Sequence, residues 1–370
     1  EMEFIMKKGW IYIVGLILVL TSCGKDYTYR IKGKLSSLNE PTIYAVFEND
    51  LEKKVDTIQC DERGSFDLKE PMGGFHTATL FFEEKGYWTT IYLEPGVTVE
   101  IEGDAHVPDM LRVQGGTINN QLGDFKKKQA ALWQEMSELT QRLNDTRNNS
   151  EALTEVTARL ADVNLRLSEA AMTYIKAHPD EEVSVVLIDL FFSDPDDTRK
   201  IDELLALLDP KLKDYYLTKA LEQFSSRAKR IALGAEAPDF SVKNIYGQSV
   251  CLDSFPDRYL LLAFTAPWCD RCQTEDLALD KISAQYAKEK LSILLVSLDD
   301  QPETVRKMVA KDQVAWNVVT DSAGQAMQLI DLYNVSALPR CFLIDEEKCI
   351  LMKTDNEVEL RQTLQKIFEE

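Results

Sequence analysis

Basic residues are scarce in this sequence relative to acidic ones. The 42 lysines and arginines stand against 62 aspartates and glutamates, which gives a formal net charge of −20 at pH 7. Neutralising a phosphate backbone requires lysine and arginine, so a nucleic-acid-binding surface is not expected. Histidine is also rare, with 3 scattered residues that offer few nitrogen ligands for a metal. The composition is that of a soluble globular protein, and the 370 residues suffice for two or three domains of about 150 residues.

The hydrophobic run near the N-terminus is too short for a typical membrane span. Trp10–Leu20 has 11 apolar residues, whereas a spanning helix needs about 20. It follows the basic start Met6-Lys7-Lys8 and ends in Leu20-Thr21-Ser22-Cys23, which resembles a bacterial lipoprotein cleavage box. The resemblance implies that residues 1–23 are a lipoprotein signal peptide and that Cys23 is acylated. An uncleaved signal anchor stays open as the alternative. In either case we expect the body of the protein to be exported.

Two of the six cysteines that follow Cys23 have a spacing that predicts a bond. Cys269 and Cys272 come shortly after the apolar run Tyr259–Phe264, and a helical pattern begins at once. Cys269 would lie in the first turn of that helix, where unpaired N–H groups and the dipole favour a thiolate. We therefore predict that Cys269 is the nucleophile of disulfide exchange and that Cys272 resolves the mixed disulfide. A zinc half-site is the competing interpretation, but a second ligand pair is missing, so no metal is expected.

Residues 24–118 are predicted to form a β-rich domain. Short strands separated by turn residues indicate a small antiparallel sandwich or barrel, and they are expected at Tyr29–Gly33, Thr42–Phe47, Lys54–Gln59, Ser65–Leu68, Thr77–Phe82, Thr89–Leu93 and Val97–Glu102. No cluster of titratable groups in this region suggests catalysis. Its aromatic residues alternate like core residues, so core packing is favoured over a binding face for Phe81, Phe82, Tyr87, Trp88 and Tyr92.

Residues 119–231 are predicted to be helical. Apolar residues repeat at heptad spacing from Leu132 to Leu143 and again from Leu153 to Tyr174, with an Asn-rich break at 144–150 between them. An antiparallel hairpin within one chain is the favoured interpretation, and the seam of a homodimer is the alternative. His178-Pro179 is expected to stop the second helix, and shorter helices should follow.

Residues 232–370 are predicted to form an α/β domain with a central mixed sheet flanked by helices. Leu291–Ser297 is a continuous apolar run, which is typical of a strand covered on both faces. Pro302–Asp312 and Gln325–Tyr333 are expected to be helices, and Val318–Thr320 a short strand between them. Two strands and a final helix should complete the domain.

Cys341 and Cys349 lie in the predicted final hairpin. If the chain turns at Glu346-Glu347, Cys341 would face Met352 and Cys349 would face Ile344. Alternation then puts the two cysteines on opposite faces, so we expect no bond between them. Both are interpreted as small buried apolar residues. Cys341 would be a third redox thiol if it pointed toward the dithiol instead.

Three ordered motifs in the last part of the chain carry a family resemblance. Gly234–Phe240, the WCxxC of Trp268–Cys272, and Pro339–Asp345 together resemble the TlpA/ResA-like family of membrane-anchored thioredoxins, over Leu233–Glu370. The resemblance implies a thioredoxin-like fold, thiol:disulfide oxidoreductase activity without a cofactor, a membrane electron donor, and protein disulfides as substrates, including apocytochrome c. Phrases such as IKGKL and VQGGTINN resemble a domain of unknown function that precedes thioredoxin domains in exported lipoproteins.

The resemblance also implies roles for single residues. Pro339 matches the family's cis proline, and the backbone before it, at Leu338, would pair with an extended substrate. Trp268 would form a wall of the same site. Glu275, three residues after the second cysteine, matches a glutamate that could accept or return the proton of Cys272.

Two positions depart from the family pattern. Arg271 stands where the family usually has proline, and Ala263 stands where ordinary thioredoxins have a buried acid. Arg271 favours the thiolate and hence an oxidant, while Glu275 opposes it. Because family members mostly act as reductants, we expect a reductase.

Two other classes of function stay open. A thiol-dependent peroxidase would need a proline and a threonine or serine at set distances before the attacking cysteine, but Ala266 and Leu262 stand there. An envelope binding protein would use the β-rich and helical parts and retain the dithiol as a vestige.

Overall fold

The computed structural model of the protein describes residues 28–49, 52–71, 74–82, 87–145, 150–255, 257–269, 272, 279–286, 291–299, 317–321 and 324–369. These residues divide into two compact units, and the boundary falls between Leu167 and Ser168, inside a long helix. The four-part division expected from the sequence stays a prediction. None of the helices that the structure describes combines the length and apolar character needed to span a membrane.

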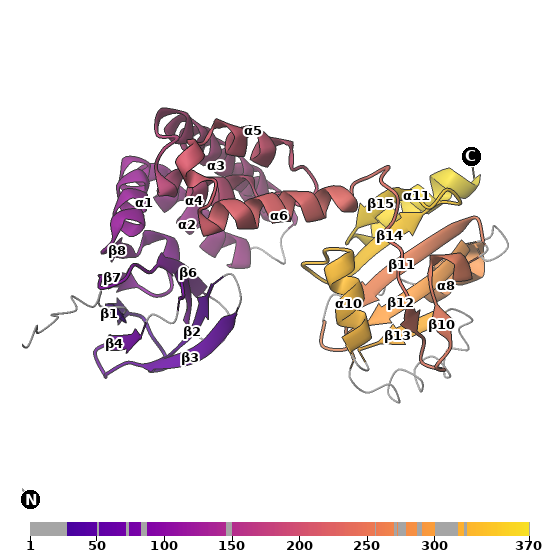
Figure 1. Ribbon diagram of the computed structural model, residues 1–370, viewed down its shortest axis with the longest axis horizontal. Coiled ribbons are helices and arrows are strands. Elements are labelled where there is room, and N and C mark those ends of the chain that lie inside the picture. Colours follow the sequence, from indigo (N-terminus) through magenta and orange to yellow (C-terminus); the bar gives the residue numbers. More distant parts are fainter. Residues whose placement is uncertain are drawn as a thin grey trace, which may run out of the picture. The chain divides into compact units, whose positions relative to one another are not determined.

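The first unit begins with two four-stranded sheets that share one core (Figure 1). Residues from both sheets meet in this core, among them Ile31 and Ile101 from one and Phe47 and Ile91 from the other. The expected all-β domain is therefore confirmed. One sheet has the order β4 (Ser65–Pro71), β1 (Thr28–Ser36), β7 (Thr98–Asp104), β8 (Arg112–Gln114); the other has the order β3 (Lys53–Gln59), β2 (Thr42–Glu48), β5 (Thr77–Phe82), β6 (Tyr87–Tyr92).

The pairing in these sheets corrects one expectation. Most neighbouring strands are antiparallel, as predicted, but β1 and β7 run parallel from the Arg30–Thr98 pair to the Ser36–Asp104 pair. The reason lies in the connection, because after β4 the chain passes through β5 and β6 of the other sheet before β7 returns to the other side of β1. On the β4 side of β1, glycine at position 33 allows close packing, since a Cβ atom there would come within 2.1 Å of the Phe66 ring.

The aromatic residues of this region are only partly core residues. Phe82 and Tyr92 are buried, and Tyr87 packs against the core. Trp88, however, is 57% exposed, because β6 alternates and its residue 88 points away from the core. The core interpretation was therefore wrong for Trp88.

Helices follow the β-rich region. The heptad pattern forms α2 (Ala130–Asp145) and α3 (Ser150–Ala177), after α1 (Thr117–Lys128). Arg159 of α3 donates to Glu135 of α2 at 2.6 Å, and Val156 and Val163 of the predicted seam are buried within the single chain. These contacts support the antiparallel hairpin, and the homodimer stays untested. The helix ends at Ala177, directly before His178-Pro179, as predicted.

The second unit contains the end of α3, further helices and a five-stranded sheet (Figure 1). The helices are α4 (Glu182–Phe192), α5 (Arg199–Leu207) and α6 (Tyr216–Arg230). The sheet has the order β13 (Asn317–Thr320), β12 (Leu291–Ser297), β11 (Tyr259–Thr265), β14 (Arg340–Ile344), β15 (Ile350–Thr354). The strands β11, β12 and β13 are parallel, and β14 and β15 are antiparallel to their neighbours.

Both faces of this sheet are covered, which explains the continuous apolar runs in β11 and β12. On one face Phe264 and Phe342 pack with residues of α10 (Gln325–Leu332). On the other face Leu261 and Leu343 pack with residues of α8 (Leu279–Tyr286) and α11 (Glu357–Glu369). The α/β class expected for this part of the chain is confirmed. The helix predicted at Pro302–Asp312 lies outside the described residues.

Candidate active site

The dithiol lies at the end of the central strand β11. After Thr265 the chain turns through Pro267 and Trp268, and the backbone N–H of Cys269 donates to the carbonyl oxygen of Ala266 at 3.2 Å. The sulfur atoms of Cys269 and Cys272 are bonded, with the two Cα atoms 5.2 Å apart. The predicted disulfide is therefore present in the structure. Cys269 is 8% exposed, and Cys272 is partly buried.

The backbone around the disulfide directs one N–H group, that of Cys272, at Cys269. The N–H of Cys272 lies 2.9 Å from the carbonyl oxygen of Cys269 and 3.1 Å from its sulfur. An N–H that points at sulfur stabilises the charged form of a thiol. This contact would favour a thiolate at Cys269 when the disulfide is open. The helix expected to start here falls largely on residues 270, 271 and 273–278, which lie outside the described residues.

A cis proline lies beside the dithiol. The Leu338–Pro339 peptide bond is cis, which the sequence alone could not establish. Pro339 is buried and directly precedes β14, whose first residue, Arg340, pairs with Phe264 of β11. Because Phe264 stands near the end of β11 that leads to Cys269, the proline and the dithiol lie at the same end of these two strands. The sequence motifs at 268–272 and 339–345 are thus brought together in space.

An apolar groove of about 520 Å³ lies at this end of the strands. Cys269 and Leu338 both line it, so the expected nucleophile and the expected substrate-pairing segment face the same space. Trp268 also lines it and is 69% exposed, as a wall residue at an open site would be. The other lining residues come from the end of β12 and from α10 and the segment after it: Leu298, Met327, Ile330, Val335, Ser336 and Ala337. Sequence reasoning missed this wall.

The charged neighbours expected from the sequence cannot be placed in the same way. Glu275 and Arg271 lie outside the described residues, as does the lipidation candidate Cys23. Ala263, which stands where ordinary thioredoxins have an acid, is fully buried opposite Cys341 of β14. Among the residues that the structure describes, no group of three or more histidine, cysteine or acidic side chains could hold a metal ion.

The hairpin that carries Cys341 and Cys349 differs in register from the prediction. Cys341 pairs with Thr354 instead of Met352, and Ile344 pairs with Ile350 instead of Cys349. The predicted pairing is wrong because a bulge lies between Leu343 and Ile344 and the turn extends to a left-handed Lys348.

The structure still separates these two cysteines, and both are free thiols. Cys341 is fully buried in the core beneath α8 and α11, and burial raises the pKa of its thiol to about 12. Cys349 is partly exposed, so the prediction of burial is confirmed for Cys341 only.

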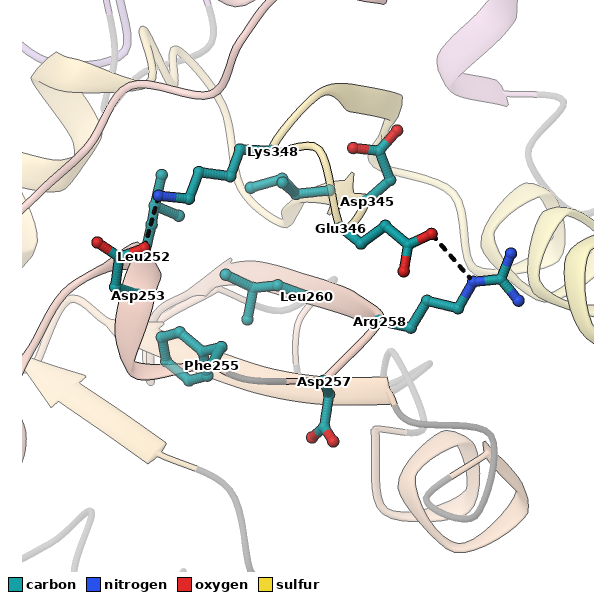
Figure 2. A pocket seen from close by; sticks show the side chains of 10 residues that line it. Leu252, Asp253, Phe255, Asp257, Arg258, Leu260, Asp345, Glu346 and Lys348 are labelled. Carbon is teal, nitrogen blue, oxygen red and sulfur yellow. Dashed lines mark hydrogen bonds and ion pairs between the residues drawn. The ribbon is translucent and has the colours of Figure 1, made fainter.

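A second pocket, of about 370 Å³, lies at the opposite end of β11 (Figure 2). Leu260 at its floor pairs with Ile344, at the far end of both strands from Pro339. Figure 2 shows ion pairs on both sides of the floor, Lys348 with Asp253 at 2.6 Å and Arg258 with Glu346 at 3.8 Å. Four of its six charged side chains are thus paired with one another, and no cysteine lines it. We therefore place the chemistry at the groove beside Cys269.

Known proteins resemble both parts of the chain. A model of the AhpC/TSA family matches residues 233–352, and a model of a domain of unknown function, DUF4369, matches residues 29–122. Thiol-disulfide oxidoreductase ResA of Bacillus cereus is 26% identical over 147 residues, which are 39% of this chain and 83% of that protein. Thioredoxin-like protein YneN of Bacillus subtilis is 29% identical over 132 residues, 35% of this chain and 75% of that protein.

A solved structure of a thiol-disulfide oxidoreductase from Bacteroides fragilis is also similar. It is 32% identical, with coverage of 36% of this chain and 98% of that chain, and a TM-score of 0.33. The fold, the disulfide and the curated relatives together define the class: the C-terminal domain is thioredoxin-like. The protein is a thiol–disulfide oxidoreductase.

Proposed function

We propose that this oxidoreductase reduces disulfides in exported proteins, working on the periplasmic side of the cell envelope from a lipid anchor on Cys23. The observation that carries the proposal is the Cys269–Cys272 disulfide at an open apolar groove beside the cis proline. A groove lined by Met327 and Leu338 suits an apolar side chain next to the target cysteine. The signal-like N-terminus supports the location.

The chemistry follows from the two sulfurs. In the reduced protein the Cys269 thiolate attacks one sulfur of a substrate disulfide, forms a mixed disulfide and releases the other substrate sulfur as a thiolate, which takes up a proton. The Cys272 thiol then loses its proton and attacks Cys269, which closes the intramolecular disulfide and releases the second substrate thiol. The substrate gains two electrons from the protein and two protons, of which one comes from Cys272 and the other from the solvent. No cofactor takes part.

Three further elements belong to the proposal. Glu275 accepts the proton of Cys272 during resolution. The backbone at Leu338 pairs with an extended substrate segment. Electrons return from a membrane donor, and the cysteines of apocytochrome c are one substrate class that the family resemblance suggests.

A peroxidase gains no support from the structure. Leu262 is fully buried within β11 and Ala266 is 4% exposed. Neither residue carries the hydroxyl or the proline ring that peroxidase chemistry needs. The envelope-binding alternative predicts that loss of the dithiol changes nothing.

Covalent trapping tests the proposal. In a Cys272→Ser variant the mixed disulfide at Cys269 cannot be resolved, so exported substrate proteins should stay attached and be identified by mass spectrometry after non-reducing purification. The matched control is Cys269→Ser, which retains Cys272 but lacks the attacking sulfur. We expect adducts with the first variant and few with the second.

Two results would contradict the proposal. Equal trapping by both variants would mean that the attachment is adventitious. An absence of exported proteins among the adducts, together with an unchanged phenotype of a Cys269→Ser strain, would favour the binding-protein alternative.

A further inference from the structure

The connection between α4 and α5, residues 193–198, reaches the thioredoxin-like sheet through a carboxylate. Oδ1 of Asp196 lies 2.7 Å from Nζ of Lys353 and 3.1 Å from Nη2 of Arg340. The connection is turned at this point, because the N–H of Asp196 donates to Oδ1 of Asp194 at 2.8 Å. All of these residues lie in the compact unit Ser168–Glu370. The contact therefore joins two segments of one unit.

Burial makes this contact more than a surface ion pair. The side chain of Lys353 is 4% exposed and that of Arg340 is 21% exposed. A buried ammonium group is unfavourable unless an anion or hydrogen-bond acceptor compensates it. Among the described residues, Asp196 is the acidic partner of Lys353. The buried lysine thus requires that the α4–α5 connection stay docked on the sheet.

The carboxylate is ionised in this contact. Burial alone would raise the pKa of Asp196, but the hydrogen bond and charge of Lys353, followed by the charge of Arg340, outweigh burial and lower the pKa below its usual value. One oxygen therefore holds two cations from neighbouring strands. Arg340 begins β14, and Lys353 on β15 pairs with Phe342 on the same face of the sheet.

The contact lies next to the site of exchange. Arg340 directly follows Pro339, and its side chain also lies over the Phe342 ring, 6.0 Å from the centroid. Holding Arg340 therefore holds the chain where the cis peptide ends and β14 begins. The segment before Pro339 lines the groove together with Cys269.

We propose that Asp196 is a positioning residue for disulfide exchange: it clasps Arg340 and Lys353 and thereby holds the segment before Pro339 in the arrangement that a protein substrate needs. This inference rests on the proposed function. Asp196 acts through Arg340 and does not line the groove. A small disulfide reacts at the sulfur of Cys269 without needing that segment. The clasp should therefore matter for protein disulfides and not for small ones.

The test compares two full-length variants that lose the same charge. Asp196→Asn removes the anion of the clasp, whereas Asp197→Asn removes the neighbouring carboxylate, which pairs with Arg199, the first residue of α5, at 2.6 Å. Reduction of insulin, with dithiothreitol as the final reductant, gives KM and kcat, and a small aromatic disulfide gives the intrinsic rate. For Asp196→Asn we expect the KM for insulin to rise about fivefold with kcat within about twofold. The small-disulfide rate should be unchanged, and Asp197→Asn should match the natural protein.

A second variant separates positioning from instability. Asp196→Asn leaves the Lys353 ammonium buried without its partner, and this alone could distort the fold. In Asp196→Asn/Lys353→Met that ammonium is absent while Arg340 still lacks its anchor. We expect the raised KM to persist in the double variant. A return to the natural KM would overturn the positioning role.

Two further outcomes distinguish the inference from the proposed function. If Asp196→Asn and Asp197→Asn give the same KM while the natural protein reduces insulin, only the clasp is wrong. If the natural protein reduces neither insulin nor the small disulfide, the proposed reductase function is wrong.

Discussion

The β-rich domain and the thioredoxin-like domain both bury a sheet, but they bury it differently. In the first, β5 alternates between buried and half-buried residues because each sheet has one face in the core. In the second, β11 and β12 are buried almost throughout because helices cover both faces. A sheet buried on both faces leaves its edges and strand ends for chemistry. At one of these ends the chain leaves β11 after Thr265 and reaches Trp268-Cys269.

Buried polar groups also differ between the two regions in what they contact. Next to the β-rich domain, Asn119 of α1 is buried and forms hydrogen bonds with the backbone of Tyr92 and Gly115, which fixes β6 against α1. In the thioredoxin-like domain Lys353 is buried against Asp196, and the disulfide lies beside the apolar groove that Cys269 lines. Asn119 thus holds two elements together, whereas Lys353 fixes the strand that pairs with β14, which begins beside the groove. A functional site can therefore be recognised in the thioredoxin-like domain but not in the β-rich domain.

The largest effect should come from paired core truncations. Phe47 and Phe342 are both fully buried, each in an aromatic cluster of its own region. Phe→Ala in a core typically costs about 3 to 5 kcal/mol. We expect Phe47→Ala to lower the stability of the β-rich domain by this amount and to leave the exchange rate with a small disulfide within about twofold. Phe342→Ala should lower both the stability and the rate, because Phe342 lies on β14 behind the cis proline.

Calorimetry of the two variants would show whether the regions behave as separate units. Two transitions, each lowered by one variant only, are the expected result. A single transition that both variants lower equally would mean that the two regions unfold together, and the comparison drawn above would then fail for stability.

A smaller difference should appear between two buried polar anchors. Asn119→Ala leaves the N–H and carbonyl of Tyr92 without their partner, at 3.0 and 2.7 Å, and should cost about 1 to 3 kcal/mol. Tyr333→Phe removes one hydrogen bond, from the hydroxyl to the carbonyl oxygen of Pro238 at 2.7 Å, and should cost about 0.5 to 1.5 kcal/mol. Urea unfolding measures both. A larger loss for Tyr333→Phe than for Asn119→Ala would contradict this order.

The sequence was sufficient for features that depend on local pattern. Alternation predicted the strands of the β-rich domain, and the spacing of Cys269 and Cys272 predicted their disulfide. It was insufficient where a single inserted residue or a distant segment decides the outcome. The bulge after Leu343 changed the partner of Cys341, and nothing local indicates it.

The parts of the site that come from distant segments were the hardest to predict. Met327 enters the groove because α10 packs over the sheet, which depends on tertiary structure. Asp196 meets Lys353 from 157 positions away, as the difference 353 − 196 gives, and its neighbourhood looks like an ordinary acidic turn. Family resemblance supplied Pro339 and Leu338, but only the structure shows them beside Cys269.

The smallest expected effect concerns two free thiols, one in each region. Burial, aided by the charge of Asp61, raises the pKa of Cys60 to about 11, and burial raises that of Cys341 to about 12 although Arg340 opposes it. The thiolate is the species that reacts with iodoacetamide. At pH 8 both thiols should therefore react far more slowly than a free cysteine with its pKa of about 8.5, and Cys341 about tenfold more slowly than Cys60. Raising the pH toward 10 should speed both reactions, since it increases the thiolate fraction of each cysteine.

Peptide mass spectrometry of the native protein measures these rates, and the same protein in urea is the control, in which the two rates should become equal. Equal slow rates in the native protein would mean that local opening and not thiolate formation limits the reaction at both positions. Faster reaction at Cys341 than at Cys60 would instead place Cys341 in contact with the solvent of the groove, and the third redox thiol would return as a hypothesis.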